Sequence, residues 1–195
     1  HVMCTLYREF KNNQHFQNIV RGQLQGGGGG IPQGPLGGVP KSAPGGGMDA
    51  GAGTGLVGQI LTNMGYTNLV AMDLSQGMLN ESRKKDVYRE FHQMVMGETL
   101  DFPTGAFDAV ITVGVLTVGH APPASLDELV RITKPGGHIV FSLRPDVYLN
   151  DGFKEKQESL VTGNKWNLVL ESEPFQPLPK GEPEVLHQVW VYQAA

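Results

Sequence analysis

Three glycines at alternate positions mark the segment Asp49-Ala50-Gly51-Ala52-Gly53-Thr54-Gly55. Glycines allow the backbone to approach a ligand closely, and the beginning of a following helix presents free N–H groups to that ligand. Such a helix is predicted directly after the segment, from apolar residues at Leu56, Val57, Ile60, Leu61 and Met64. The segment therefore predicts a loop and helix that together bind a nucleoside-containing ligand.

Strand-like and helix-like patterns alternate after this loop. Apolar runs typical of buried strands occupy residues 68–72, 92–96, 107–113 and 138–143. Helical patterns are found at 56–64, from Ser75 as an N-cap to about Val87, at 122–133 and at 151–162. This alternation predicts an α/β fold, a Rossmann-like, doubly wound, mostly parallel sheet. The last two strand-like runs, 166–171 and 185–192, have no full helix between them and predict a C-terminal antiparallel hairpin on the sheet edge.

The first 47 residues differ in composition from the rest of the chain. Residues 21–47 hold 12 glycines, including the run Gly26–Gly30, together with four prolines. Such a composition buries too little apolar surface to offset its ordering entropy. We therefore expect a largely disordered segment over 1–47 and a folded domain over 48–195.

Overall composition restricts the classes of function. The 195 residues carry a net charge of −4, whereas proteins that bind nucleic acid through its phosphates are usually basic. Cys4 is the only cysteine, so an internal disulfide is impossible, and we see no His/Cys cluster with metal-ligand spacing. With no signal peptide or apolar run of about 18 residues, we expect a cytoplasmic or nuclear protein that does not contact a membrane.

An acid at the end of the strand predicted over residues 68–72 indicates a ribose site. Asp73 follows the apolar run 68–72 and lies about 20 residues beyond the glycine loop, a spacing typical of a carboxylate that binds ribose hydroxyls. The glycines alone leave the cofactor open, because Gly53, Gly55 and Gly58 also match the dinucleotide pattern. A carboxylate at Asp49 disfavours that alternative, since it repels a pyrophosphate and attracts an ammonium group.

Taken together, four segments resemble the class I S-adenosylmethionine-dependent methyltransferases. They are 49–55, Asp73, Phe107-Asp108-Ala109-Val110 and Lys134-Pro135-Gly136-Gly137. The longer run 107–122 is similar to the methyltransferase-like protein 27 group, the Williams–Beuren-region methyltransferases. The resemblance covers residues 48–195. It implies S-adenosyl-L-methionine as cofactor and methyl transfer to a small-molecule or protein acceptor that the sequence does not name.

The resemblance also implies a role for individual residues in holding the cofactor. Gly51, Ala52, Gly53 and Gly55 line its amino-acid and ribose portions, and Asp49 orients the methionine ammonium. Asp73 accepts the ribose hydroxyls, and Leu74 packs on the adenine. Val113 and Gly114 begin a wall near the sulfonium, and Gly97 contacts the adenine through its backbone. A catalytic residue is not identified; His120, just past the fourth strand, is a weak candidate for a base, and an exposed loop histidine is the simpler interpretation.

The chain departs from the family pattern in its N-terminal part. In place of an apolar first strand stand Ser42-Ala43-Pro44-Gly45-Gly46-Gly47, so only Met48 is strand-like and the first strand is predicted to be nearly absent. Residues 1–47 also do not resemble the helical lid that usually covers the cofactor. We therefore expect an N-terminally truncated or altered coding sequence. The missing lid and first strand leave open a non-catalytic module that binds S-adenosylmethionine or S-adenosylhomocysteine. The dinucleotide pattern of Gly53, Gly55 and Gly58 leaves open an NAD-dependent oxidoreductase.

Overall fold

A computed structural model describes residues 46–63, 65–117, 119–176 and 184–195 of the chain. The first half of the fold contains β1 (Gly47–Ala50), α3 (Leu56–Asn63), β2 (Leu69–Asp73), α4 (Gln76–Arg83), β3 (Glu90–Gln93) and β4 (Phe107–Thr112). The second half contains α5 (Ser125–Ile132), β5 (Thr133–Leu143), α6 (Pro145–Asn150), α7 (Phe153–Thr162), β6 (Trp166–Glu171) and β7 (Gln188–Ala194). The predicted helices and strands are present, and α6 is an addition that the sequence patterns did not indicate.

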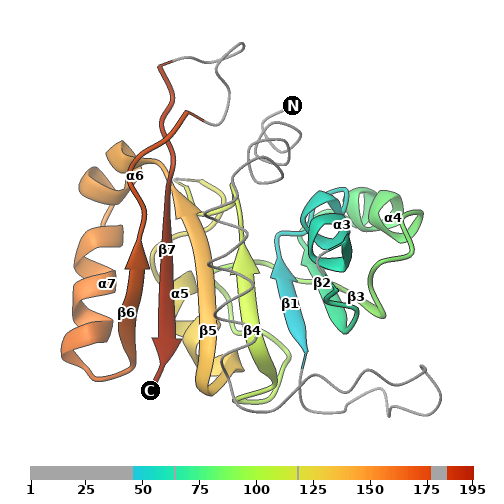
Figure 1. Cartoon of the computed structure of the whole chain (residues 1–195), viewed down its shortest axis with the longest axis horizontal. Coiled ribbons are helices and arrows are strands. Elements are labelled where there is room, and N and C mark those ends of the chain that lie inside the picture. Colours follow the sequence, from blue (N-terminus) through green and yellow to red (C-terminus); the bar gives the residue numbers. More distant parts are fainter. Residues whose placement is uncertain (1–45, 64, 118, 177–183) are drawn as a thin grey trace.

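The strands form one seven-stranded sheet in the order β3-β2-β1-β4-β5-β7-β6 (Figure 1). Neighbouring strands from β3 to β5 are parallel, whereas β7 is antiparallel to both β5 and β6. The predicted mostly parallel sheet with a C-terminal antiparallel pair is therefore confirmed. Of that pair, β7 lies inside the sheet and β6 forms its edge.

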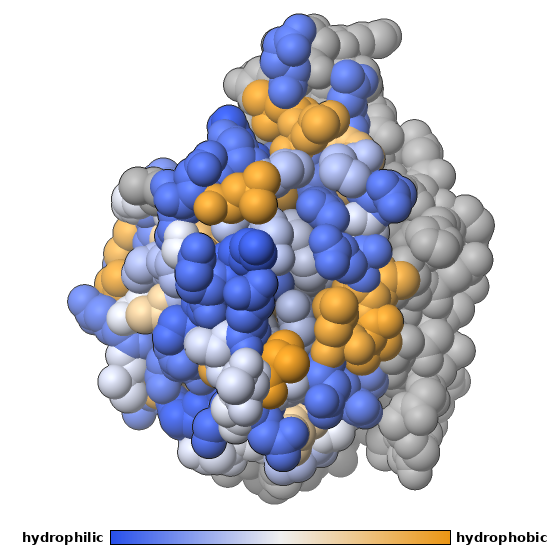
Figure 2. Space-filling model, turned by 90° about the vertical axis from the view of Figure 1, so that its left-hand side faces the viewer, coloured by the Kyte–Doolittle hydropathy of each residue, from blue (hydrophilic) through white to orange (hydrophobic). Residues whose placement is uncertain are grey.

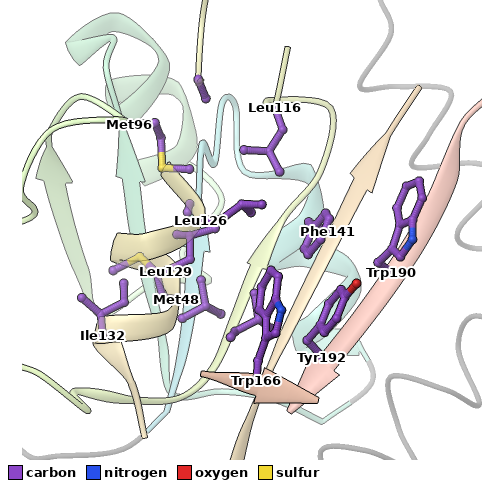
Figure 3. Close-up of a cluster of buried hydrophobic side chains, with 14 of the residues drawn as sticks. Met48, Met96, Leu116, Leu126, Leu129, Ile132, Phe141, Trp166, Trp190 and Tyr192 are labelled. Carbon is purple, nitrogen blue, oxygen red and sulfur yellow. The ribbon is translucent and has the colours of Figure 1, made fainter. Parts of the chain in front are cut away.

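Helices cover both faces of the sheet, and each face has its own apolar core. On one face, Val57 and Ile60 of α3 and Leu79 of α4 pack on the sheet. On the other, α5 contributes Leu126, Leu129 and Ile132, which lie over the sheet beside Met48 of β1 (Figure 3). Because successive residues of a strand point to opposite faces, Met48 and Asp49 face different cores.

Stacked aromatic rings fix the antiparallel end of the sheet. Phe141 of β5 stacks on Trp166 of β6 and on Trp190 and Tyr192 of β7, each with ring centroids 6.0 Å apart, and Trp166 and Tyr192 lie closer still at 3.9 Å (Figure 3). Trp166 and Trp190 are almost fully buried. Large aromatic side chains contribute strongly to burial, so this cluster accounts for the docking of β6 and β7 on the parallel strands.

The prediction that the first strand is nearly absent is wrong. β1 is short but central, and it pairs in parallel with β2 through Gly47 to Ala50 and with β4 through Gly47 to Asp49. Met48 and Ala50 are fully buried in it. Two flanking strands supply hydrogen-bond partners on both sides, so four residues of weak strand propensity still form a strand.

Residues 134–137, whose proline and two glycines predict a turn, form a bulge within β5. Phe107 of β4 pairs with Thr133, but Ala109 pairs with His138, so residues 134–137 all stand opposite Asp108. Asp108 holds this irregularity in place: it accepts hydrogen bonds from Lys134 Nζ at 2.6 Å and from the N–H of Gly46 at 2.7 Å. The carboxylate therefore joins the bulge to the chain entering β1.

The surface formed by α6, α7 and the edge strand β6 is mainly hydrophilic. Figure 2 shows this side of the molecule, with separate apolar patches among polar side chains. Leu149, Val161 and Leu168 are the exposed large hydrophobic residues on these three elements, together with Val169 of β6. Within the described ranges, no helix is long and apolar enough to cross a membrane. The expected disorder of residues 1–47 falls almost entirely outside the described residues.

Candidate functional site

The sheet reverses its winding direction at β1. The chain runs outward from β1 through β2 to β3, and then returns to add β4 on the other side of β1. In open α/β sheets, such a switch point leaves a crevice at the carboxyl ends of the strands, where ligands bind. The segments that follow β1, β2 and β4 meet at this edge, and they contain the predicted site residues 49–55, 73–74 and 113–114.

The glycine loop connects β1 to the beginning of α3. The N–H groups of Gly51 and Ala52 both donate to the carbonyl of Met72 at the end of β2, at 2.8 and 2.9 Å. Gly51 has a φ of +80°, and a Cβ added to it would lie 2.3 Å from a methyl group of Val115. Gly53 also has a positive φ, +54°, but an added Cβ there would meet nothing within 4 Å. The loop thus packs tightly against β2 and Val115 and leaves open space beside Gly53.

Asp73 ends β2 and holds the loop from the other side. Its Oδ2 accepts a hydrogen bond from the N–H of Gly53 at 2.8 Å, and its Oδ1 accepts one from the N–H of Ser75 at 2.8 Å. A carboxylate has about four acceptor positions, so Asp73 retains capacity for further donors such as ribose hydroxyls. The side chain is half-buried, which places it at the border of the crevice.

Asp49 is a buried carboxyl at the base of the loop. It is 1 % exposed and accepts a hydrogen bond from the hydroxyl of Tyr88. Burial raises the pKa of Asp49 to about 7, and the charge of Asp73 adds to this effect, while the hydrogen bond from Tyr88 opposes it. Near neutral pH, a small change in the surroundings therefore changes the charge of Asp49.

The remaining predicted cofactor residues lie on the loops around the crevice. Leu74, directly after Asp73, is 59 % exposed, so its apolar side chain is accessible to a ligand at this strand end. Val113 is buried, and the N–H of Gly114 donates to Ser142 Oγ at 3.0 Å. Gly97 has a φ of +98°, and an added Cβ would come within 2.8 Å of Pro122. Their roles toward a ligand stay predictions.

His120 lies farther along the segment that follows β4. It is exposed, and its N–H donates to the carbonyl of Thr117 at 3.3 Å within a short turn. This position agrees with the simpler interpretation of an exposed loop histidine. Among the residues that the structure describes, no group of three or more His, Cys, Asp or Glu side chains is arranged to hold a metal ion.

Comparison with known proteins identifies the domain. A family model described as a methyltransferase domain matches residues 48–141. Human methyltransferase-like protein 27 is 38% identical over 115 residues, which are 58% of this chain and 46% of that protein. A malonyl-[acyl-carrier protein] O-methyltransferase of Serratia marcescens is 35% identical over 97 residues, 49% of this chain and 36% of that enzyme. The chain thus spans less than half the length of these two curated relatives.

These matches support a class I S-adenosylmethionine-dependent methyltransferase domain that begins at Met48 and is related to methyltransferase-like protein 27. The fold agrees: a solved S-adenosylmethionine-dependent methyltransferase from Mesorhizobium loti superposes with a TM-score of 0.57 at 14% identity, over 80% of this chain and 93% of that one. The matched region begins at Met48 and contains the glycine loop, Asp73 and Gly114. These similarities support S-adenosyl-L-methionine over a dinucleotide, the alternative that the glycines left open.

The residues at the switch point of this methyltransferase domain fit that cofactor. Gly53 borders open space, Asp73 has acceptor positions beyond its two backbone hydrogen bonds, and Leu74 exposes an apolar side chain directly after Asp73. A nucleoside needs this combination of a close backbone, a ribose acceptor and an apolar surface for the base.

Sequence reasoning missed one polar residue of the site, Tyr88. It lies between α4 and β3, and its hydroxyl contacts both Asp49 and the N–H of Gly58. The only signal was the glycine at position 58, which lies inside a helix, where glycine is otherwise unfavourable. A Cβ on Gly58 would lie 2.4 Å from the hydroxyl oxygen of Tyr88.

Proposed function

We propose that this chain binds S-adenosyl-L-methionine and transfers its methyl group to a small-molecule or protein acceptor. One observation carries the proposal: the glycine loop, Asp73 and the Val113–Gly114 segment, which are far apart in the sequence, meet at the switch point of the sheet. Their meeting at this edge is what a nucleoside cofactor requires. The match to the methyltransferase domain model and the similarity to methyltransferase-like protein 27 support the same activity.

The chain's own residues divide the binding task. The loop backbone at Gly51 to Gly55 and the buried Asp49 face the amino-acid portion, Asp73 takes the ribose, and Leu74 covers the base. Bound S-adenosyl-L-methionine supplies a methyl group on a positively charged sulfur, which makes that carbon electrophilic. Val113 and Gly114 form the wall beside the transfer position. Such a wall helps to exclude water and to orient the acceptor, two requirements of a displacement reaction.

A general base is not required when the acceptor is already a good nucleophile. His120 is the weak candidate for that role, because it follows the same β4 segment that walls the transfer position. Its exposure and its place in a turn are those of an ordinary loop histidine, and a base is needed only for an acceptor of low nucleophilicity. The nature of the acceptor therefore determines whether His120 matters for turnover.

Calorimetric titration combined with a turnover assay tests the proposal. We expect binding of S-adenosylmethionine and S-adenosylhomocysteine and no binding of NAD. Formation of S-adenosylhomocysteine in the presence of acceptor mixtures would establish transfer. Binding of S-adenosylhomocysteine without turnover on any acceptor would support the alternative of a non-catalytic binding module. Binding of NAD alone would overturn the proposal.

A further inference from the structure

A buried hydroxyl connects three parts of the glycine-loop region. The side chain of Tyr88 is 7 % exposed, and its hydroxyl donates a hydrogen bond to Oδ2 of Asp49 in β1. The same oxygen accepts a hydrogen bond from the N–H of Gly58 in α3 at 3.0 Å. Tyr88 itself belongs to the segment that leads into β3. One oxygen atom therefore connects β1 before the loop, α3 after it and the segment that leads into β3, two strands away from β1.

The surrounding chain is shaped to let the Tyr88 ring pass. An added Cβ at Gly58 would lie 2.3 Å from the ring carbon that carries the hydroxyl, and one at Gly55 would lie 3.2 Å from another ring carbon. Gly55 also has a φ of +86°. The ring thus packs directly against the backbone at Gly55 and Gly58, where a side chain on Gly58 would collide with it and one on Gly55 would crowd it. Phe91 of β3 supports it from the side by an edge-on contact, with ring centroids 5.7 Å apart.

Within the described part of the chain, few charged or titratable groups act on the Asp49 carboxyl. Asp73 acts on it from the end of β2, Tyr88 donates to it, and the N–H of Gly58 comes from the first turn of α3. The side chain of Lys85 passes Gly55, where its Cδ would lie 3.2 Å from an added Cβ. A carboxylate buried among such groups depends strongly on each hydrogen bond it accepts, because water does not replace a lost donor.

We propose that Tyr88 is a positioning residue for cofactor binding: its hydroxyl orients Asp49 and stabilises its ionised form, so that Asp49 attracts the ammonium group of the cofactor's amino-acid portion. This inference rests on the proposed function, since it concerns the same site. Tyr88 does not touch the reacting atoms and acts through Asp49. Its hydroxyl also anchors the first turn of α3, which keeps the loop at a fixed distance from β1.

The test compares two ligands that differ in the amino-acid portion, which carries the ammonium group that Asp49 is proposed to attract. S-adenosylhomocysteine carries the amino-acid portion, whereas 5′-methylthioadenosine keeps the nucleoside and the sulfur but lacks it. For Tyr88→Phe we expect a loss of about tenfold in affinity for S-adenosylhomocysteine and little change for 5′-methylthioadenosine. Tyr192→Phe is the matched control, because it also removes a buried tyrosine hydroxyl bond, to Gln157 at 2.8 Å, but on β7.

The pH profile separates positioning from a purely structural role. Because burial raises the pKa of Asp49 to about 7, affinity of the wild type for S-adenosylhomocysteine should increase through that pH as the carboxyl ionises. Removing the Tyr88 donor disfavours the ionised form, so the midpoint of this increase should move to higher pH in Tyr88→Phe. In Asp49→Asn the pH dependence should disappear, and adding Tyr88→Phe to that variant should cause no further selective loss.

The binding results either support or overturn the role of Tyr88 as a positioning residue. Selective loss for S-adenosylhomocysteine with a shifted pH midpoint supports the inference. An equal loss for both ligands, or an unchanged midpoint, overturns it while wild-type binding leaves the proposed function intact. Failure of the wild type to bind either ligand overturns the proposed function, and this inference with it. If Tyr88→Phe does not fold, the wild type and Asp49→Asn still give the pH dependence, and its persistence in Asp49→Asn overturns the inference.

Discussion

Asp73 shows how one side chain both builds the loop and serves the ligand. The sequence predicts its place, since an acid that ends an apolar strand about 20 residues after a glycine loop is typical of a ribose site. The structure adds that both of its oxygens already hold backbone N–H groups, of Gly53 and Ser75. These contacts were not predictable from spacing, because they depend on the conformation of the loop.

Replacement of Asp73 by alanine should weaken the binding of S-adenosylhomocysteine by about tenfold or more. The variant loses a ribose acceptor and two charge-assisted hydrogen bonds, each of which contributes about 1.5–3 kcal/mol. Calorimetry provides the affinity. Asp127→Ala is the control, because it removes an exposed acid of α5 that pairs with Lys156. Equal affinities of the two variants would remove Asp73 from the site.

Substitution of Gly51 should lower the unfolding free energy by more than the strain of its positive φ alone. Gly51→Ala places a Cβ against Val115, whereas Gly65→Ala, at a φ of +99°, places one in open space. Both variants carry the backbone strain of about 1–3 kcal/mol for a non-glycine residue at positive φ. Urea denaturation should therefore show a larger loss of unfolding free energy for Gly51→Ala, with weaker binding of S-adenosylhomocysteine. A loss no larger than in Gly65→Ala would refute the tight packing of the loop.

Asp49 should make the folded protein less stable as the pH rises, the reverse of the effect of a carboxyl group whose pKa is lowered by folding. Its pKa is raised from 3.8 to about 7 in the folded protein, so the folded state binds the proton more tightly than the unfolded state. The contribution of this group to the unfolding free energy is fully present below the ordinary pKa of 3.8, and it is lost as the pH rises to about 7. Asp49→Asn removes the effect, so the unfolding free energy of the variant relative to wild type should rise by on the order of 2 kcal/mol between about pH 5 and pH 8. A difference that stays constant across this range would contradict the assignment.

At the scale of helices and strands, the sequence predicts the type of an element better than its ends. The helix expected to run from Ser75 to about Val87 ends at Arg83, and α6 was missed although Pro145 occupies its first turn, where proline is favoured. β1 was underestimated because its stability comes from its two neighbours. The bulge at 134–137 looked like a turn, because Pro135 and two glycines are typical of both.

The N-cap of α4 gives a test at this scale. Ser75 Oγ accepts a hydrogen bond from the N–H of Met78 at 3.3 Å, in the arrangement that the sequence predicts. Ser75→Ala should lower the unfolding free energy by about 1 kcal/mol, and Ser75→Asp should restore it, because aspartate also caps helices. Chemical denaturation of both variants checks this, with Ser159→Ala inside α7 as control. A loss of stability in Ser159→Ala as large as that in Ser75→Ala would show that the cap contributes nothing specific.

For the molecule as a whole, alternating patterns were sufficient for the class of fold but not for its complete strand order. The parallel direction of β1, β2 and β3, and of β4 and β5, follows from the helix between each successive pair, whereas no helix lies between β3 and β4. The insertion of β7 between β5 and β6 does not, since it depends on Trp166, Phe141 and Tyr192 stacking across three strands. In the same way, spacing predicted Asp49 and Asp73 as site residues, but Tyr88 became visible only when distant segments were brought together.

The crystal structure of the complex with S-adenosylhomocysteine tests the central claim most directly. We expect the ligand at the switch point, with its amino-acid portion over the loop from Gly51 to Gly55 and its ribose hydroxyls within hydrogen-bond distance of the Asp73 carboxylate. The adenine should lie against Leu74. A ligand bound elsewhere on the sheet, or one whose ribose does not contact Asp73, would contradict the account.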